Sequence, residues 1–536
     1  MLRVLVADKL ADEGLGLLRG RPEVEHECKL GLSPAQLAEV VGGYDGLIIR
    51  SGVKVTAEVF ARPGRLRAIA RAGVGVDNVD LAAATRAGVL VMNTPDANTV
   101  STAEHTFAMM LAVARHIPSA CADLRAGGWN RARFEGAQLA GKSLGIVGLG
   151  RVGTAVARRA LAFDMKVLAY DPFIQAESAL SGGVRLVRSL AELMPRLDFL
   201  TIHSALTDST RGLIGAGELA MARPGLRVVN CARGGLVDEA ALAEAIGSGQ
   251  VAAAALDVFE QEPPGKDHPL LGLPQVIATP HLAASTHEAQ TAVSVEAVAA
   301  LLDYLLRDEI RGACNVVGLP MHLSQRDRAC ADLVTRMGTI LSALCDEGVT
   351  SVCLTTCGDA LALLAPALRR FGLTALLAPF VSERLNVINV DEFARARSIA
   401  VRHAAEPQSA GPTDRVRLAV ESAGRTHEIE GTVFVDGLPH ILAIDGYPEN
   451  LIPHGQMLLI FNDDRPGVIG HVGTTLGNRG INIADMALSR HDARALMVLT
   501  LDQPPPAEAL EALAASPSIL LLRSVMLPPL PSPARE

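Results

Sequence analysis

Three side chains in the middle of the chain have the types that acid/base chemistry on a small organic acid needs. His281 follows an apolar run that reads as a strand, and an imidazole titrates in the range that proton transfer requires. A lone histidine after a strand has a structural role about as often as a catalytic one. Glu262 strengthens the functional interpretation, because a carboxylate bonded to the far ring nitrogen would stabilise the imidazolium and orient it. Arg233, in a glycine-flanked loop, offers a planar fork to a carboxylate and a neighbouring 2-oxo group.

Residues 144–171 predict a cofactor for that chemistry, because they read as strand, glycine turn, amphipathic helix and second strand ending on an acid. Gly148 permits the turn, Gly150 lets the backbone approach a pyrophosphate, and Gly153 lets the helix pack closely. Asp171 has the spacing of a carboxylate that bonds the adenosine ribose, and its charge would repel a 2′-phosphate. We therefore expect NAD rather than NADP, the alternative being a purely structural turn.

Further cations and glycines lie on loops that follow predicted strands. Arg50, Lys54 and Arg71 are such cations, although each alone could equally be a solvated side chain. Gly73 and Gly75 would let backbone amides approach an anion closely. An NAD-binding unit beside a cation-rich cleft indicates hydride transfer between the cofactor and an anionic substrate.

The elements that must position these residues are alternating strands and helices. Such a repeat predicts parallel sheets whose ligand-facing loops lie at the strand carboxyl ends. We expect strands at residues 3–7, 46–49, 68–70, 145–147, 165–169, 198–203, 227–230, 252–257 and 276–279. A helix at 102–115 is apolar on most sides, so it is either central to the core or covered by another subunit. Trp129 follows it in a mixed segment, where packing is its expected role, and Arg131 could reach an anionic ligand.

The predicted fold is α/β with four domains. Residues 1–97 and 283–312 are expected to form a discontinuous, flavodoxin-like substrate-binding domain, and 98–282 a doubly wound, Rossmann-like NAD-binding domain. Residues 313–453 form an α+β intervening domain with a linker-like stretch at 406–414. Residues 454–536 show the ferredoxin-like order βαββαβ, followed by a proline-rich tail from residue 528 that we expect to be disordered.

Composition narrows the class of protein. The 536 residues are 49% hydrophobic and carry a net charge of −9, which argues against a nucleic-acid or anionic-membrane partner. The eight cysteines are scattered without zinc-binding spacing, so no metal site is expected. The N-terminal apolar run is too short for a signal peptide, and we find no apolar run of membrane-spanning length. These features favour a cytoplasmic protein.

The motifs RSGVKVT, RAGVGVDNVD, GLGRVG, NCARGGLVDE, LDVFEQEP and TPHLAASTHEAQ resemble those of the D-isomer-specific 2-hydroxyacid dehydrogenases. The whole chain, including DDRPGVIGHVGTTLGNRGINIADM, resembles the long-form D-3-phosphoglycerate dehydrogenases. This resemblance implies NAD-dependent oxidation of 3-phosphoglycerate to 3-phosphohydroxypyruvate, the first step of L-serine biosynthesis. It also implies that Arg233 binds substrate, His281 is the acid/base and Glu262 is its partner.

The same resemblance maps further contacts onto this sequence. Those implied for the cofactor are Gly148, Gly150, Arg151, Val152, Gly153, Asp171, Thr207, Cys231, Ala232, Arg233, Asp257, His281 and Ala283. Those implied for the substrate are Arg50, Lys54, Val74, Gly75, Arg131 and Arg233. From the residues alone, Asp257 ends a strand and could meet the nicotinamide edge. Ala205 and Ala283 replace a usual proline and glycine, and the methyl group of Ala283 would crowd the nicotinamide if its φ were positive.

The C-terminal segment resembles the ACT module, a small-molecule regulatory fold. The resemblance implies serine binding between two such modules, at positions that match Asn462, Asp464 and Asn482. We therefore expect L-serine as an effector and a homo-oligomer, either a dimer or a tetramer. Residues 489–495 lack the glycines of the family's hairpin, so we expect a looser or longer turn there.

Two alternatives differ from this hypothesis. The first is another NAD-dependent D-2-hydroxyacid dehydrogenase, acting on hydroxypyruvate, glyoxylate or 2-oxoglutarate. It would be expected to lack the ACT module. The second is a non-catalytic, NAD-sensing binding protein, which has no need of a paired histidine and carboxylate.

Overall fold

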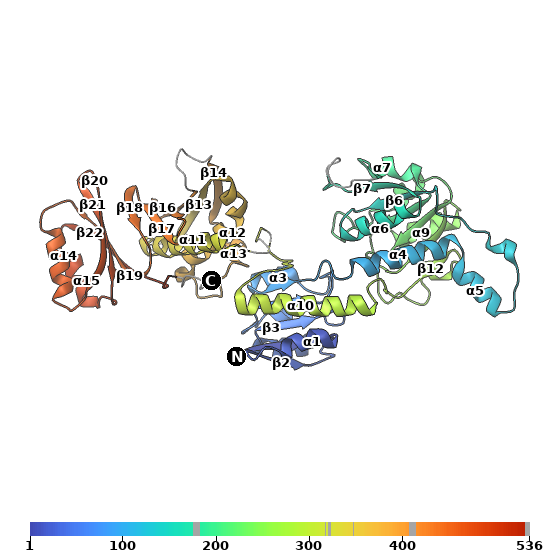
Figure 1. The fold of residues 1–536 in the computed structure, drawn as a ribbon, viewed down its shortest axis with the longest axis horizontal. Helices are drawn as coiled ribbons and strands as arrows, with labels where there is room; N and C mark the ends of the chain where they lie inside the picture. Colours follow the sequence, from blue (N-terminus) through green and yellow to red (C-terminus); the bar gives the residue numbers. More distant parts are fainter. Residues whose placement is uncertain (175–182, 317, 320–322, 347, 407–413, 531–536) are drawn as a thin grey trace.

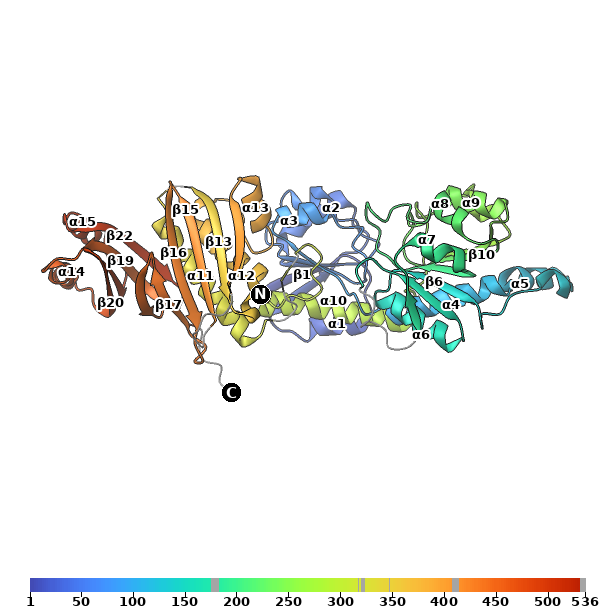
Figure 2. The same ribbon diagram turned by 90° about the horizontal axis from the view of Figure 1, so that it is seen from above.

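The computed structural model describes residues 1–174, 183–316, 318–319, 323–346, 348–406 and 414–530. The expected linker at 406–414 therefore lies almost entirely outside the described residues, as do residues 531–536 of the expected tail. Four sheets follow one another along an elongated molecule (Figures 1 and 2). Each sheet lies within one of the four segments expected to be domains, and the mixed α/β fold class is confirmed.

The first sheet is parallel, with the order β2-β1-β3-β4-β5 of flavodoxin-like folds. Its strands are β1 (Leu2–Val6), β2 (Val24–Cys28), β3 (Gly46–Ile49), β4 (Ala68–Arg71) and β5 (Leu90–Met92). Its helices are α1 (Asp12–Arg19), α2 (Pro34–Val40), α3 (Leu81–Arg86) and the returning α10 (His287–Arg307). Ser33 begins α2 with a capping box, as the Ser-Pro pair indicates. Helix α10 buries Val298 and Leu301 against this sheet, so residues distant in sequence complete the domain.

The second sheet is also parallel, with the order β12-β11-β10-β9-β6-β7-β8. Its strands are β6 (Ser143–Val147), β7 (Lys166–Tyr170), β8 (Val184–Leu186), β9 (Phe199–Ile202), β10 (Leu226–Asn230), β11 (Val251–Leu256) and β12 (Val276–Ala278). Its helices are α4 (Thr99–Ala114), α6 (Arg151–Ala162), α7 (Leu190–Leu193), α8 (Ala216–Met221) and α9 (Glu239–Gly247). Strand order reverses between β6 and β9, which is the switch point where such sheets bind dinucleotides.

Helix α4 packs against α6 and the second sheet, so its apolar character is explained by burial in the core. Beyond it, α5 (Ile117–Arg125) and the short helix η3 (Arg131–Phe134) form an arm, and neither helix contains a buried residue. The arm projects at the end of the molecule away from the first sheet (Figures 1 and 2). Trp129 lies in this arm and is 79% exposed, so the packing role expected for it is wrong within a single chain.

The intervening segment packs two long helices on one mixed sheet. The helices are α11 (Gln325–Leu344) and α12 (Asp359–Leu377), with a shorter α13 (Val390–Ala396). The sheet order is β14-β13-β15-β16-β17-β18. Its strands are β13 (Val349–Cys357), β14 (Ala400–Glu406), β15 (Arg415–Ser422), β16 (Arg425–Val433), β17 (Pro439–Ile444) and β18 (Tyr447–Leu451).

The C-terminal segment forms the expected βαββαβ arrangement. Its strands are β19 (Gly455–Asp463), β20 (Ile483–His491), β21 (Arg494–Leu501) and β22 (Ile519–Leu527), in the order β20-β21-β19-β22. Helices α14 (Val468–Gly477) and α15 (Ala507–Ala514) accompany them. Met457 and Leu459 share one hydrophobic cluster with Ile441 of the intervening segment. The last two domains are therefore joined by a common core.

The hairpin between β20 and β21 corrects one expectation. His491 pairs directly with Arg494, so only two residues make the turn, and Asp492 adopts a φ of 54°. A short polar side chain tolerates this left-handed conformation, which explains why glycine is not required for a tight turn.

Two helical segments, His287–Arg307 and Asp359–Phe380, are long and apolar enough to cross a membrane by length and composition alone. Their most apolar windows are 56% and 50% buried inside the fold. Since the first packs on α1 and β4 and the second on α11, the fold itself accounts for their apolar faces.

Candidate active site

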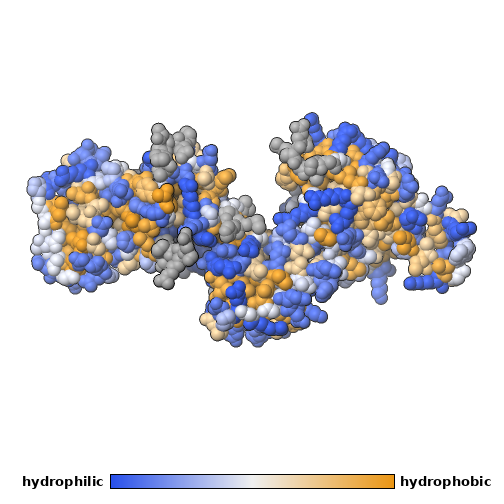
Figure 3. All heavy atoms as spheres, in the orientation of Figure 1, coloured by the Kyte–Doolittle hydropathy of each residue, from blue (hydrophilic) through white to orange (hydrophobic). Residues whose placement is uncertain are grey.

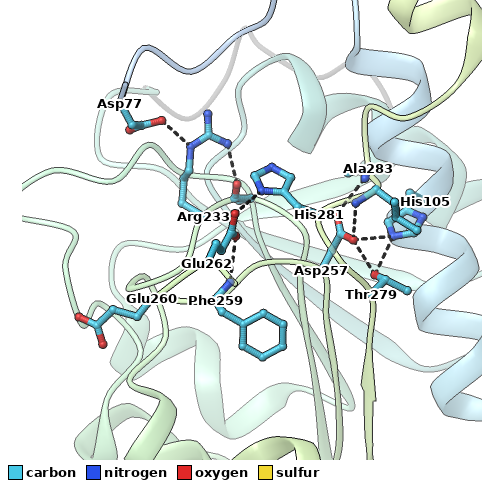
Figure 4. A network of polar contacts seen from close by, with 12 residues as sticks. Asp77, His105, Arg233, Asp257, Phe259, Glu260, Glu262, Thr279, His281 and Ala283 are labelled. Carbon is cyan, nitrogen blue, oxygen red and sulfur yellow. Dashed lines mark hydrogen bonds and ion pairs between the residues drawn. The ribbon is translucent and has the colours of Figure 1, made fainter. Parts of the chain in front are cut away.

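The three candidate catalytic side chains lie on neighbouring loops at one edge of the second sheet. Arg233 follows β10, Glu262 follows β11 and His281 follows β12, and these strands are adjacent in the sheet. Because parallel strands present their carboxyl ends at the same edge, residues distant in sequence meet there. Figure 4 shows Arg233, Glu262 and His281 grouped at this edge.

His281 and Glu262 form the pair expected from the sequence. The ring nitrogen Nδ1 of His281 lies 2.8 Å from Oε2 of Glu262. The second carboxylate oxygen, Oε1, accepts a hydrogen bond of 3.1 Å from the backbone amide of Phe259, which anchors the glutamate in its own loop. With a proton on Nδ1, the ring keeps Nε2 as its basic nitrogen. Both side chains are partly exposed, so the pair is accessible to a ligand.

The loop that carries His281 is wrapped around a buried carboxylate. Asp257 is 0% exposed. Its Oδ1 accepts bonds from the Thr279 hydroxyl at 2.5 Å and the Leu282 amide at 2.7 Å, while Oδ2 accepts from the Ala283 amide at 2.8 Å. Nε2 of His105 lies 3.2 Å from Oδ1. Burial alone would raise the pKa of Asp257, but the bonds from these donors outweigh it and hold the pKa below its ordinary value.

Backbone strain in this loop lies at the histidine. His281 has a φ of 55°, whereas Ala283 is not among the residues with positive φ. The amide of His281 donates to the backbone oxygens of Asp257, at 2.8 Å, and Thr279, at 3.0 Å. The crowding expected of a left-handed Ala283 therefore does not apply, because the left-handed position is two residues earlier. Ala283 is buried in the core of the second sheet.

Arg233 reaches from the second sheet to the first. Its Nε lies 3.1 Å from Oδ2 of Asp77, on the loop after β4, and its Nη1 donates to the Ala232 backbone oxygen at 2.7 Å (Figure 4). A Cβ atom at Gly75 would lie 1.9 Å from Nη2 of Arg233. The guanidinium therefore occupies the space that a side chain at position 75 would take, which places Arg233 against the backbone expected to bind a substrate carboxylate.

Other expected substrate residues are brought only partly together. Arg50, at the end of β3, donates to the Lys9 backbone oxygen at 3.2 Å and contacts the side chain of Gln290. Lys54 is exposed on the same loop. Burial, together with the charge of Arg233, lowers the pKa of Arg71 to about 10. Arg71 was expected only as one of the cations that follow predicted strands. In the structure it lies near enough to Arg233 for the two positive charges to interact.

Two expected substrate residues have other surroundings. The backbone oxygen of Val74 accepts a bond of 2.6 Å from Nδ2 of Asn93. Arg131 is exposed in the projecting arm, and the described residues of one chain do not bring it to Arg233.

The glycine turn fits a dinucleotide. Gly148 has a φ of 89°, and a Cβ there would lie 2.8 Å from the backbone of His203. A Cβ at Gly153 would lie 2.1 Å from the Gly148 oxygen, while Gly150 is the N-cap of α6 and has open space beside it. Asp171 accepts bonds from the amides of Leu149 and Phe173 at the end of β7. Free helix amides beside an uncrowded glycine are the chemistry that a pyrophosphate needs.

The remaining expected cofactor residues surround this turn and the sheet edge. Arg151 is the first residue of α6 and pairs with Asp96, and Val152 packs on the core. Thr207 is exposed in the loop after β9. Cys231 is buried beneath the Arg233 loop, where burial and the nearby Asp257 raise the pKa of its thiol to about 12.

Comparison with known proteins identifies the family. Residues 107–283 match the D-isomer specific 2-hydroxyacid dehydrogenase NAD-binding domain, 328–445 the D-3-phosphoglycerate dehydrogenase intervening domain, and 456–517 the ACT domain. D-3-phosphoglycerate dehydrogenase of Methanocaldococcus jannaschii is 41% identical over 97% of this chain and 98% of its own. The chain belongs to the D-3-phosphoglycerate dehydrogenases. The Bacillus subtilis enzyme is 36% identical over 98% of this chain and 100% of its own.

Solved structures similar to this D-3-phosphoglycerate dehydrogenase family member cover just over half of its chain. A glyoxylate reductase from Paecilomyes thermophila has a TM-score of 0.54 and 29% identity, covering 58% of this chain and 98% of its own. A D-lactate dehydrogenase from Aquifex aeolicus, complexed with NAD and lactic acid, has a TM-score of 0.52 and 26% identity, covering 56% of this chain and 95% of its own. The NAD-binding domain match confirms the expected cofactor.

The expected effector residues of this family member lie at two ends of the ACT sheet. Asn462 ends β19 opposite Ala495, whereas Asn482 precedes Ile483, which pairs with Leu501 at the far end of β21. Asp464 lies near Arg490, beside the first end, and Asn482 bonds Asp502. One chain therefore does not bring the three together. Asn462 is buried, and its Nδ2 donates to the Asp463 backbone oxygen at 2.7 Å.

Sequence reasoning missed three residues of the site. Asp77 lies within the quoted motif RAGVGVDNVD but was not singled out. His105 lies in the polar N-terminal half of helix α4, beside Glu104 and Thr106, so no signal in the sequence distinguished it. Thr279 was expected only as the last residue of a strand, before Pro280, and nothing in the sequence indicated a bond to Asp257.

Proposed function

We propose that the chain oxidises 3-phosphoglycerate to 3-phosphohydroxypyruvate with NAD, the first step of L-serine biosynthesis. The observation that carries this proposal is the histidine–carboxylate pair of His281 and Glu262 beside Arg233, in a chain similar along its whole length to D-3-phosphoglycerate dehydrogenases. A non-catalytic NAD-binding protein has no use for that pairing.

His281 is proposed as the acid/base. Its Nε2 accepts the proton of the substrate hydroxyl as the carbonyl forms, and Glu262, 2.8 Å from Nδ1, stabilises the resulting imidazolium and orients the ring. When bound, NAD supplies the hydride acceptor. In the reverse direction the same imidazolium returns its proton to the carbonyl oxygen.

Arg233 is proposed to hold the substrate carboxylate and polarise the reacting oxygen. Its fork lies against Gly75, so carboxylate binding can use both the guanidinium and the backbone amides of that loop. Arg50 and Lys54 are proposed for the phosphate, since both lie on the loop after β3. Arg131 can contribute only from a second copy, because its arm projects away from its own site.

The cofactor is proposed to lie along the carboxyl edge of the second sheet. Gly148, Gly150 and Gly153 receive the pyrophosphate at the start of α6, and Asp171 binds the adenosine ribose. The other contacts proposed for it are Arg151, Val152, Thr207, Cys231, Ala232, Asp257 and Ala283.

A turnover assay tests the reaction. Reduction of 3-phosphohydroxypyruvate by NADH is the favourable direction at neutral pH, so NADH loss at 340 nm is expected with the wild-type chain. His281→Asn should abolish turnover while NADH binding, measured by fluorescence titration, is retained. Turnover of glyoxylate or hydroxypyruvate alone would favour another D-2-hydroxyacid dehydrogenase. NADH binding without turnover of any of these acids would favour the binding protein.

Regulation and assembly complete the proposal. We propose a four-domain chain divided as the sequence analysis predicts, with L-serine bound between ACT modules of two copies through Asn462, Asp464 and Asn482. The exposed Ile117, Leu124 and Trp129 of the arm supply an apolar surface for a homo-oligomer, and Figure 3 shows hydrophobic residues on the visible face of the NAD-binding domain. Activity measured against L-serine and a light-scattering mass test these two points.

All eight cysteines are free, which suits a cytoplasmic location.

A further inference from the structure

One face of helix α4 contacts the segment that connects β12 to α10. Ser101, His105 and Met109 are spaced four residues apart, so they share this face. Oγ of Ser101 lies 2.7 Å from Oγ1 of Thr286, the N-cap of α10. One turn later, Nε2 of His105 lies 3.2 Å from Oδ1 of Asp257 and 3.3 Å from Oγ1 of Thr279. The helix therefore contacts both the crossing between the domains and the base of the catalytic loop.

The bonding pattern determines where the proton of His105 lies. An ionised carboxylate only accepts hydrogen bonds, and the Thr279 hydroxyl already donates to Asp257 at 2.5 Å. Nε2 of His105 therefore carries hydrogen and donates toward these two oxygens. Figure 4 shows the ring on the α4 side of Asp257, with the His281 loop on the other side.

Asp257 transmits this contact to the reacting histidine. Its side chain accepts from the Leu282 and Ala283 amides, and its backbone oxygen accepts from the His281 amide at 2.8 Å. His281 is held in a left-handed conformation, φ 55°, which persists only where the surroundings enforce it. The loop has no regular secondary structure of its own, so these bonds set where the imidazole lies.

We propose that His105 is a positioning residue for the dehydrogenase reaction: through Asp257 and Thr279 it holds the backbone of residues 279–283, and so the position of His281. The inference rests on the proposed function only for the assignment of His281 as acid/base. A loop displaced by about 1 Å is enough to lower a rate by about a hundredfold. The contacts of the His105 ring are with Asp257 and Thr279 and not with His281 itself, so its effect should fall on kcat.

Paired substitutions test the hydrogen bond rather than the bulk of the ring. His105→Gln places an amide nitrogen near Nε2, whereas His105→Asn places one near Nδ1, out of reach of Asp257. We expect the asparagine variant to lower kcat for phosphohydroxypyruvate reduction by roughly 10- to 100-fold, with KM changed by less than about threefold. The glutamine variant should stay within about fivefold of wild type. His26→Asn, in β2 of the first sheet, is the matched control and should leave kcat unchanged.

A second readout does not depend on turnover. In the full chain with NADH, amide hydrogen exchange across residues 279–283 should be at least about tenfold faster in His105→Asn than in wild type or His105→Gln. If His105→Asn shows this faster exchange but the wild type does not turn over phosphohydroxypyruvate, the proposed substrate is wrong and the role of His105 in holding residues 279–283 stands.

Two results would overturn the positioning role. One is wild-type kcat and protection in His105→Asn, and the other is an equal loss in both variants, which would assign the effect to ring packing. If His105→Asn does not fold, Thr279→Val removes the hydroxyl between the ring and Asp257 and should produce the same kcat and exchange changes. Unchanged values in that variant would refute the role.

Discussion

Glu449 is a buried carboxylate whose removal should stabilise the junction between the intervening and ACT domains at neutral and alkaline pH. It lies in β18, is 8% exposed, and its Oε1 has no hydrogen-bond partner among the described residues. Burial raises its pKa from an ordinary 4.5 to about 7, with a partly offsetting bond from Ser489 on β20. The charged form is therefore disfavoured in the folded state.

The magnitude follows from linkage. Because the folded-state pKa is raised, the folded chain binds more protons than the unfolded chain between about pH 4.5 and 7, so stability falls as pH rises through that window. Above pH 7 the penalty is constant, at roughly 2–3 kcal/mol. Glu449→Gln removes the titrating charge and keeps the shape. The variant should be more stable than wild type by that amount at pH 8.5, and by under about 1 kcal/mol at pH 5.

Scanning calorimetry of the full chain at the two pH values measures the difference. For a folding unit the size of the intervening and ACT domains together, a gain of roughly 2–3 kcal/mol in the free energy of unfolding raises Tm by about 5 °C or more. Glu421→Gln, at an exposed carboxylate of β15, is the control and should show no pH-dependent difference. A Glu449→Gln variant equal to or less stable than wild type at pH 8.5 would refute the assignment of a buried, unpaired charge.

Three further perturbations probe the site and the domain junction. Glu262→Gln removes the charge that stabilises the imidazolium of His281, so kcat should fall by roughly a hundredfold or more while NADH titration gives an unchanged Kd; a normal kcat would contradict the pairing. Asp77→Asn keeps an acceptor for Arg233 but removes a competing negative charge, so KM for the anionic substrate should fall up to about fivefold at low salt. An unchanged or higher KM in steady-state assays would show that Asp77 does not compete. Arg336 is 1% exposed and donates hydrogen bonds to the backbone oxygens of Pro453, Pro528 and Pro529. Arg336→Met should therefore destabilise the C-terminal domains by about 3–5 kcal/mol in calorimetry and speed proteolysis near residue 528. Resistance to proteolysis equal to that of wild type would show that Arg336 does not hold these segments together.

Much of the candidate site could be predicted because each motif is local. Gly148 and Gly153 are required by close contacts with backbone atoms, whereas a side chain at Gly150 would meet open space. The strand-end positions of Arg233, Glu262 and His281 follow from alternating strands and helices in the sequence, since parallel strands end at a common edge. The same reasoning predicted the sheet edge that carries the site.

Other properties depend on contacts that no local pattern contains. The left-handed residue of this loop is His281 and not Ala283, because the Asp257 carboxylate accepts hydrogen bonds from the amides of the two residues that follow His281, Leu282 and Ala283. Trp129 is exposed because its arm leaves the domain, although a lone tryptophan usually packs. The residues expected to bind the effector lie at opposite ends of the ACT sheet, which becomes apparent only from the strand register.

The amino-acid sequence by itself determined the nucleotide-binding unit and predicted the order of four domains and an acid/base pair, because these depend on residue type, short-range spacing and the period of apolar residues. Only the tertiary structure decided how α4 contacts the loop of His281, how Asp77 meets Arg233 across the first two sheets, and that the ACT sheet shares a hydrophobic cluster with the intervening segment. The first two of these contacts join residues more than a hundred positions apart. Their geometry is set by packing of whole elements and not by any pattern along the chain.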